Sequence, residues 1–182
     1  MPNLELLIDR ILTRAFAEAD LPARATSAMV AEAEGRLGFA LHPLLARLYT
    51  EVANGGFGPG PGPGLLPLLG PGHNVVDEYL SLLERSALEK PAVWPAGAVP
   101  ILDWGCSMRA AVDCHDEMGQ VLLFEPNGHG GGACDDCWFL DALSLAAWLE
   151  AWLTETAWHS PDLGPHEVTY PQRWSHAAVR LL

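Results

Sequence analysis

The sequence predicts an α+β fold with N-terminal helices, a central antiparallel β-sheet of hairpins and a closing C-terminal helix. Apolar residues in the N-terminal part recur at the i, i+3, i+4 and i+7 positions of helices. Between residues 98 and 125, three short segments separated by turns read as strands, the second of them by the alternation of apolar and polar residues. Helical spacing then returns at residues 145–153, and nothing alternates strand with helix as a parallel sheet requires.

The helices before the sheet are expected over about residues 4–19, 27–36 and 43–53, with a fourth that begins at Asn74. Thr26 or Ser27 can cap the second helix and Asn74 the fourth, because their side chains accept hydrogen bonds from free backbone amides. Pro43 suits the first turn of the third helix, where its missing N–H costs nothing. Asn54-Gly55 then stops that helix.

Strands are expected over residues 98–104, 106–114 and 120–125, joined by short turns. A glycine-rich loop over residues 127–132 follows the last of them. Ser144 caps the final helix, whose apolar stripe places Trp148 and Trp152 in the core. An irregular tail is expected over about residues 160–182.

The segment NGGFGPGPGPG at residues 54–64 could be a phosphate-binding loop, a linker or a turn inside one domain. A phosphate loop places its glycines between a strand and a helix, whereas these glycines follow a helix. A linker would require the residues before Gly58 to fold alone, and three short helices bury too little for that. We therefore expect a long turn within a single domain spanning residues 1–182, with Phe57 folded back onto the core.

Charge is unevenly spread along the chain, which carries a formal net charge of −13. Residues 110–172 contain 11 acidic residues and no Lys or Arg. Direct binding to nucleic acid is therefore not expected, because phosphate contacts need basic side chains. The excess acid could serve solubility alone, or it could form a face that meets a basic partner protein.

Segments for targeting or membrane insertion are not apparent. No apolar run approaches the ~20 residues that span a bilayer, and the first 20 residues do not resemble a signal peptide. We expect a cytoplasmic protein with no membrane partner. Its four cysteines should then be reduced rather than form a disulfide framework.

Cys134 and Cys137 have the Cys-x-x-Cys spacing of half a zinc site. In the expected hairpins, the loop after residue 125 returns near Cys106, so Cys106, His129, Cys134 and Cys137 could meet around one ion. Cys114 lies too far from Cys106 along a strand to share that ion. The alternative is a set of ordinary residues near a loop, and the default expectation is no metal and no cofactor.

No arrangement of catalytic residues can be assembled from the sequence. The Gly-x-Ser-x-Gly motif of a nucleophile elbow is absent. Asp113, His115 and Asp116 are neighbours in sequence, but adjacent strand residues point to opposite faces. We therefore expect a protein that is not an enzyme.

The segment AEAEGRLGFALHPLLARLYTEVANGGFGPG resembles the opening of SUKH-superfamily domains, which include the Smi/Knr-type cell-wall regulator and many bacterial immunity proteins. The resemblance rests on Glu34, Leu37, Gly38, Leu41, Pro43, Leu48, Tyr49 and the Asn-Gly-Gly-Phe at residues 54–57. WPAGAVPILDWGCSMRAAVDC resembles the family's central hairpin, and SLAAWLEAWL its closing helix. The resemblance covers about residues 27–153.

This resemblance implies a protein-binding domain, either an immunity protein that neutralises a cognate toxin, often a nuclease, or a regulatory scaffold of the cell-wall-regulator type. In the first case an acidic face would bind a basic toxin. The candidate protein-binding residues are Asp103, Trp104, Asp113, Asp116, Glu117, Asp135 and Asp136. Trp104 could anchor a partner, or it could pack back on the sheet.

Overall fold

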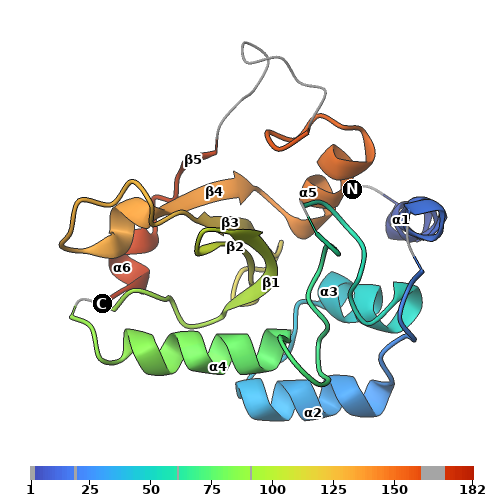
Figure 1. Cartoon of the computed structure of the whole chain (residues 1–182), viewed down its shortest axis with the longest axis horizontal. Coiled ribbons are helices and arrows are strands. Elements are labelled where there is room, and N and C mark those ends of the chain that lie inside the picture. Colours follow the sequence, from blue (N-terminus) through green and yellow to red (C-terminus); the bar gives the residue numbers. More distant parts are fainter. Residues whose placement is uncertain (1–2, 19, 61, 91, 161–170) are drawn as a thin grey trace.

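The structure is a computed structural model of the chain and describes residues 3–18, 20–60, 62–90, 92–160 and 171–182. Its helices are α1 (Leu4–Glu18), α2 (Ser27–Leu37), α3 (Pro43–Arg47), the π-helical η1 (Leu48–Val52), α4 (Val75–Ser86), the 3₁₀-helical η2 (Cys134–Cys137), α5 (Leu145–Leu153) and α6 (Ala177–Arg180). Its strands are β1 (Ala98–Gly105), β2 (Met108–Asp113), β3 (Val121–Phe124), β4 (Trp138–Ala142) and β5 (Gln172–Arg173). The expected α+β order is confirmed (Figure 1).

The expected helix caps are present. Thr26 accepts a hydrogen bond from the Met29 amide at 3.2 Å, Asn74 accepts one from Asp77 at 3.0 Å, and Ser144 accepts one from Ala147 at 3.1 Å. Each bond satisfies an amide that has no partner within its own helix. The helices therefore begin where the capping residues predicted.

The third helix differs from the expected continuous helix, because it changes into the π-helical turn η1 after Arg47. The Ala53 amide donates to the Leu48 carbonyl at 3.3 Å, which is the wider i→i+5 bond. Tyr49 is fully buried in this turn, and its hydroxyl donates to the Leu66 carbonyl at 3.0 Å. The turn thus ties the helix to the chain that follows the glycine-rich segment.

The glycine-rich segment is a turn, as expected, and it returns to the sheet. The Leu65 amide donates to the Phe57 carbonyl at 2.7 Å, and the Leu66 amide donates to the Ile101 carbonyl of β1 at 2.8 Å. The side chain of Asn54 accepts from the Leu68 amide at 2.8 Å, so the two ends of the turn are joined. Phe57 is buried, which confirms that it folds back onto the core.

All neighbouring strands are antiparallel, in the order β1-β2-β3-β4-β5. The three expected strands are present, but β2 begins at Met108 rather than at residue 106. Cys106 and Ser107 have φ values of 49° and 66°, which a two-residue hairpin turn requires. Strands β4 and β5 were not predicted from the sequence, and the tail expected to be irregular contains β5 and α6. Residues 161–170 lie outside the described part.

The core is a continuous cluster that joins the helices to the sheet. Helix α4 lies along one side and contacts β1, while α5 packs against α1 and β4 (Figure 1). Trp148 and Trp152 of α5 are buried, as their helical spacing predicted. None of the helices in the described ranges is long and apolar enough to cross a bilayer.

Candidate functional site

An open hollow of about 640 Å³ lies where α1, the glycine-rich turn, β1 and the chain after α5 meet. We call it the aromatic hollow. Its lining includes Arg14, Glu18, Gly58, Pro59, Gly60, Gly62, Trp104, Trp152, Glu155, Trp158, His159 and Ser160. It brings together stretches far apart in sequence, and Trp104 is the candidate residue of the sequence analysis that lies in it.

Three aromatic rings form one wall of the aromatic hollow. The ring of Trp104 lies with its centroid 4.8 Å from that of His159 and 5.3 Å from that of Trp158. Trp104 is half-buried, so part of its ring faces solvent. The ring thus packs against other rings and also lines an open surface, and its role as an anchor for a partner stays a prediction.

Asp141 is hydrogen-bonded to Trp158, one of the three rings of this wall. Its two carboxylate oxygens accept hydrogen bonds from the indole N–H groups of Trp148 and Trp158, each at 2.9 Å. Burial raises the pKa of Asp141 to about 6, although both indole bonds favour the charged form. The carboxylate therefore fixes the orientation of Trp158 at a cost in desolvation.

Two buried ring nitrogens of the wall have no hydrogen-bond partner within the described ranges, namely Trp104 Nε1 and His159 Nε2. Burial lowers the pKa of His159 to about 4, so its imidazole is neutral at physiological pH. An indole N–H that is buried without a partner is costly. Both nitrogens are themselves buried, so neither is exposed in the aromatic hollow.

The guanidinium of Arg14, on the rim of the aromatic hollow, is already neutralised. It pairs with Glu18 at 2.7 Å and Glu155 at 3.4 Å, and it stacks over the ring of Trp152 at 4.8 Å from the centroid. One cation against two carboxylates leaves the rim acidic. The hollow thus combines aromatic surface with negative charge.

The acidic candidates do not form one face, because the structure divides them between the two ends of the sheet. At one end lie the β1–β2 turn and the loop over residues 125–137, which the register of β1, β2, β3 and β4 brings together. The Asn127 side chain donates to the Cys106 carbonyl at 3.0 Å and joins the two segments. We call this the acidic end; it carries Glu125, Asp135 and Asp136, and Trp104 lies two residues before its turn.

Asp103 precedes Trp104 but faces the other side of β1. Its carboxylate accepts from Arg109 at 2.8 Å, and Arg109 also pairs with Glu78 of α4 at 3.1 Å. Alternation along the strand explains why the two neighbours separate. Asp103 therefore neutralises an internal cation rather than lining the aromatic hollow.

The remaining candidates lie at the opposite end, in or next to the β2–β3 turn. Asp116 and Glu117 are in that turn, and the Asp116 carboxylate accepts from the amides of Met118 and Gln120. The prediction for Asp113 is wrong: this residue is buried at 2% exposure and pairs with Arg180 of α6 at 2.8 Å. Its role is to hold the C-terminal helix on the sheet, and it is not available to a partner.

A family model described as the SMI1 / KNR4 family (SUKH-1) matches residues 24–151. The chain belongs to the SUKH-1 family. No curated protein matches it. The match agrees with the resemblance predicted over residues 27–153. It includes Trp104 and the acidic end of this SUKH-1 domain, whereas Trp158 and His159 lie beyond it.

Three of the four candidate metal ligands of the SUKH-1 domain lie close together. The ligand atoms of His129, Cys134 and Cys137 lie within 4.8 Å of one another. Cys106, expected as the fourth, is in the exposed β1–β2 turn and is not part of this group. The expectation of a four-residue cluster is thus corrected to three residues, because residue 106 belongs to the turn and not to the loop.

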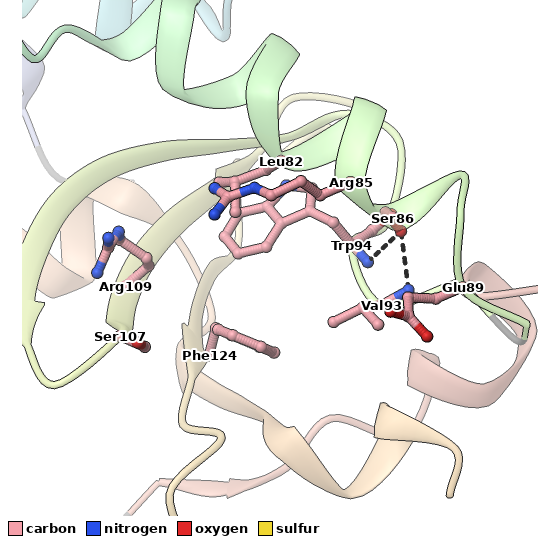
Figure 2. A pocket seen from close by; sticks show the side chains of 9 residues that line it. All are labelled: Leu82, Arg85, Ser86, Glu89, Val93, Trp94, Ser107, Arg109 and Phe124. Carbon is pink, nitrogen blue, oxygen red and sulfur yellow. Dashed lines mark hydrogen bonds between the residues drawn. The ribbon is translucent and has the colours of Figure 1, made fainter.

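A second hollow of the SUKH-1 domain, of about 260 Å³, lies between α4 and the β1–β2 turn (Figure 2). The rings of Trp94 and Phe124 form its apolar floor, and Arg85 and Arg109 lie at its edge. Ser86 accepts from the amides of Val93 and Trp94, each at 2.8 Å, and so fixes the chain that carries the floor. Arg109 is already paired with Asp103 and Glu78, whereas Arg85 makes no ion pair within the described residues and donates to the Ser81 carbonyl at 3.3 Å.

Most residues of the aromatic hollow could not be predicted from the sequence. Trp158 and His159 lie in a segment without periodic spacing, just before the expected irregular tail, and their only signal was an aromatic pair beyond a helix. The Gly-Pro repeat was predicted to be a turn, but its place in the lining of the aromatic hollow was not predicted. Only Trp104 was selected, and its ring partners come from residues more than fifty positions away.

Proposed function

We propose that this SUKH-1 domain is a non-enzymatic protein-binding domain, and that it acts as a bacterial immunity protein that neutralises a cognate basic toxin. The single observation that carries the proposal is the excess of negative charge, a formal net charge of −13. Most arginines of the domain are already paired with its own carboxylates. A nuclease is the class of toxin that best fits. A cytoplasmic location is part of the same proposal.

The internal neutralisation of the arginines supports a basic partner. Six arginines pair with carboxylates of the domain itself, namely Arg10, Arg14, Arg36, Arg47, Arg109 and Arg180. Most of these pairs are partly exposed, so each adds little to stability. Their effect on recognition is larger, because they leave few free cations on the surface and make the field around the domain negative.

The contact surface that we propose is the aromatic hollow together with the acidic end. Trp104 would be the anchor, because buried aromatic residues contribute most to the binding energy of interfaces. Glu125, Asp135 and Asp136 at the acidic end would attract the basic partner and speed association. Asp116 and Glu117 belong to the far end of the sheet and lie outside this surface.

A nuclease fits such a surface for an electrostatic reason. A protein that binds nucleic acid needs Lys and Arg to contact phosphates, so its substrate groove is basic. An acidic domain that occupies the groove competes with the substrate without performing any chemistry. Binding of this kind also agrees with the expectation that the domain does not itself bind nucleic acid.

The alternative is a regulatory scaffold of the cell-wall-regulator type, without a toxin partner. Its support is the family match itself, because the family is described by the names SMI1 / KNR4, which the sequence resemblance connects with the Smi/Knr-type regulator. A toxin gene next to the gene for this chain would favour immunity. The charge asymmetry favours immunity over the scaffold, since a scaffold has no need of a basic partner.

The test is a pull-down from native lysate at low and at high salt, with bound proteins identified by mass. The partner must be basic, must bind stoichiometrically and must weaken with salt. It must also arrest growth when expressed alone and lose that effect when this domain is co-expressed. A partner that is harmless alone, or no partner at either salt concentration, would contradict the immunity function.

A further inference from the structure

The loop over residues 125–137 contains a cluster of side chains that protein binding does not use. The ligand atoms of His129, Cys134 and Cys137 lie within 4.8 Å of one another. We propose that these three residues bind a thiophilic divalent metal ion, with zinc as the expected ion. The metal site does not require the proposed toxin binding and would exist in a scaffold protein as well, although Asp136 belongs both to the acidic end and to the surroundings of His129.

The two cysteines lie on the same side of η2. In a 3₁₀-helix three residues make one turn, so side chains at i and i+3 lie one above the other. The Sγ atoms of Cys134 and Cys137 are 3.1 Å apart. Two thiolates on a tetrahedral zinc lie about 3.8 Å apart, given Zn–S bonds of about 2.3 Å. A small rotation of the half-buried Cys134 side chain therefore opens the pair to the required separation.

His129 is held next to the two cysteines by Asp136, whose Oδ1 atom also accepts from the Cys137 thiol at 3.6 Å. The Nδ1 atom of His129 lies 2.7 Å from Oδ1 of Asp136, so Nδ1 carries the proton and donates it to the carboxylate. The lone pair is then on Nε2, so His129 would bind the metal ion through that atom. Metal-binding histidines commonly donate their other N–H to a carboxylate in this way. Asp136 is thus a positioning residue for the site.

The glycines of the loop have no side chains that could pack and hold its conformation. Gly131 and Gly132 have φ values of 100° and 101°, which favour glycine, and a Cβ at either position would meet nothing within 4 Å. At the end of the loop, the Glu125 amide donates to the Cys137 carbonyl at 2.8 Å, and Cys137 is buried in the core. A metal ion would tie His129 near the start of the loop to Cys137 at its end.

The chemistry of the three ligands favours zinc over a redox pair. A disulfide between Cys134 and Cys137 would use two of the three residues and leave the His129–Asp136 pair without a role. Metal binding uses all of them, and each thiol releases its proton to solvent as its metal–sulfur bond forms. Three protein ligands leave a fourth tetrahedral position for water or another ligand.

The experiment uses the full chain, purified in a reducing buffer without chelator. Its zinc content should be one ion per chain. After removal of the zinc, addition of Co²⁺ should give the thiolate-to-cobalt charge-transfer band and the intense d–d bands of tetrahedral cobalt. A chain without stoichiometric metal, whose apo form gives no tetrahedral cobalt spectrum, would overturn the proposal, as would a Cys134–Cys137 disulfide in freshly isolated protein.

Variants separate a metal site from a general effect on folding. Cys134→Ser should lose the cobalt charge-transfer intensity from one thiolate and retain no stoichiometric zinc. Asp136→Asn should keep the spectrum but bind zinc roughly 10- to 100-fold more weakly. Cys106→Ser and Cys114→Ser are matched controls outside the cluster and should bind zinc as the wild type does; loss of zinc in Cys106→Ser would overturn the three-residue assignment.

Discussion

Replacing Asp141 by Asn tests the physical account of the aromatic wall. Burial raises the pKa of Asp141 from 3.8 to about 6 in the folded protein. The folded state therefore holds this proton more tightly than the unfolded state does. The stability that Asp141 contributes is fully present below pH 3.8 and is lost as the pH rises through 6. Asn cannot ionise, so the variant does not lose stability in this range.

The size of the effect follows from the shift in pKa. Each pKa unit corresponds to about 1.4 kcal/mol, so a rise from 3.8 to about 6 corresponds to about 3 kcal/mol. Relative to wild type, Asp141→Asn should therefore gain about 2 to 3 kcal/mol of unfolding free energy between about pH 3.5 and pH 7. The amide can accept at only one oxygen and loses one indole bond, but that loss applies at every pH and leaves the trend intact.

The assay is urea denaturation of both proteins across this pH range, with the difference in unfolding free energy plotted against pH. The difference is needed because His159 also makes the stability of both proteins depend on pH. Burial lowers the pKa of His159 from 6.5 to about 4, so the stability that its neutral form contributes is lost as the pH falls through this range. Asp9→Asn, on the exposed face of α1, is the matched control for the loss of a carboxylate. A difference that does not change with pH, or that falls as pH rises, would refute the reasoning.

Two further substitutions test the packing of the fold. Gly64→Ala should lower the unfolding free energy by about 2 kcal/mol or more, because Gly64 has φ of 79° and the new Cβ would overlap the Phe57 carbonyl group. Gly62→Ala in the same turn meets nothing within 4 Å and should be near neutral in the same denaturation assay. Arg180→Ala should cost about 2 kcal/mol in thermal unfolding, since it leaves the buried carboxylate of Asp113 without its cation. Adding Asp113→Asn should recover part of that loss; no recovery would contradict the ion-pair account.

The helices and the first hairpins could be predicted because their signals are local. A capping side chain such as Ser144 and a stripe such as Trp148 and Trp152 specify a helix from neighbouring residues alone. Strand β4 was missed because Trp138–Ala142 is short and half-buried, and it is defined by its pairing with β3. The same holds for β5, which consists of two residues.

A residue of the candidate site could be predicted only where its own type and its place in the sequence were sufficient to select it. Trp104 could be selected from its place near a turn, but its ring partners come from the chain after α5. Asp113 looked like part of an acidic surface because its cation, Arg180, lies 67 positions further on. Most of the metal cluster could be predicted, because Cys134 and Cys137 lie in one helical turn. Cys106 was expected there because of the hairpin geometry, and it is not part of the group.

The measurement that tests the central claim most directly is the binding kinetics of the purified partner with wild type, Trp104→Ala, Asp135→Asn and Glu117→Gln at two salt concentrations. We expect Trp104→Ala to weaken binding by about 2 kcal/mol, or roughly 30-fold, mainly through faster dissociation. Asp135→Asn should slow association at low salt, while Glu117→Gln, an equal change of charge at the far end of the sheet, should leave both rates unchanged. Equal effects of Asp135→Asn and Glu117→Gln, or full binding by Trp104→Ala, would contradict the assignment of the interface to the aromatic hollow and the acidic end.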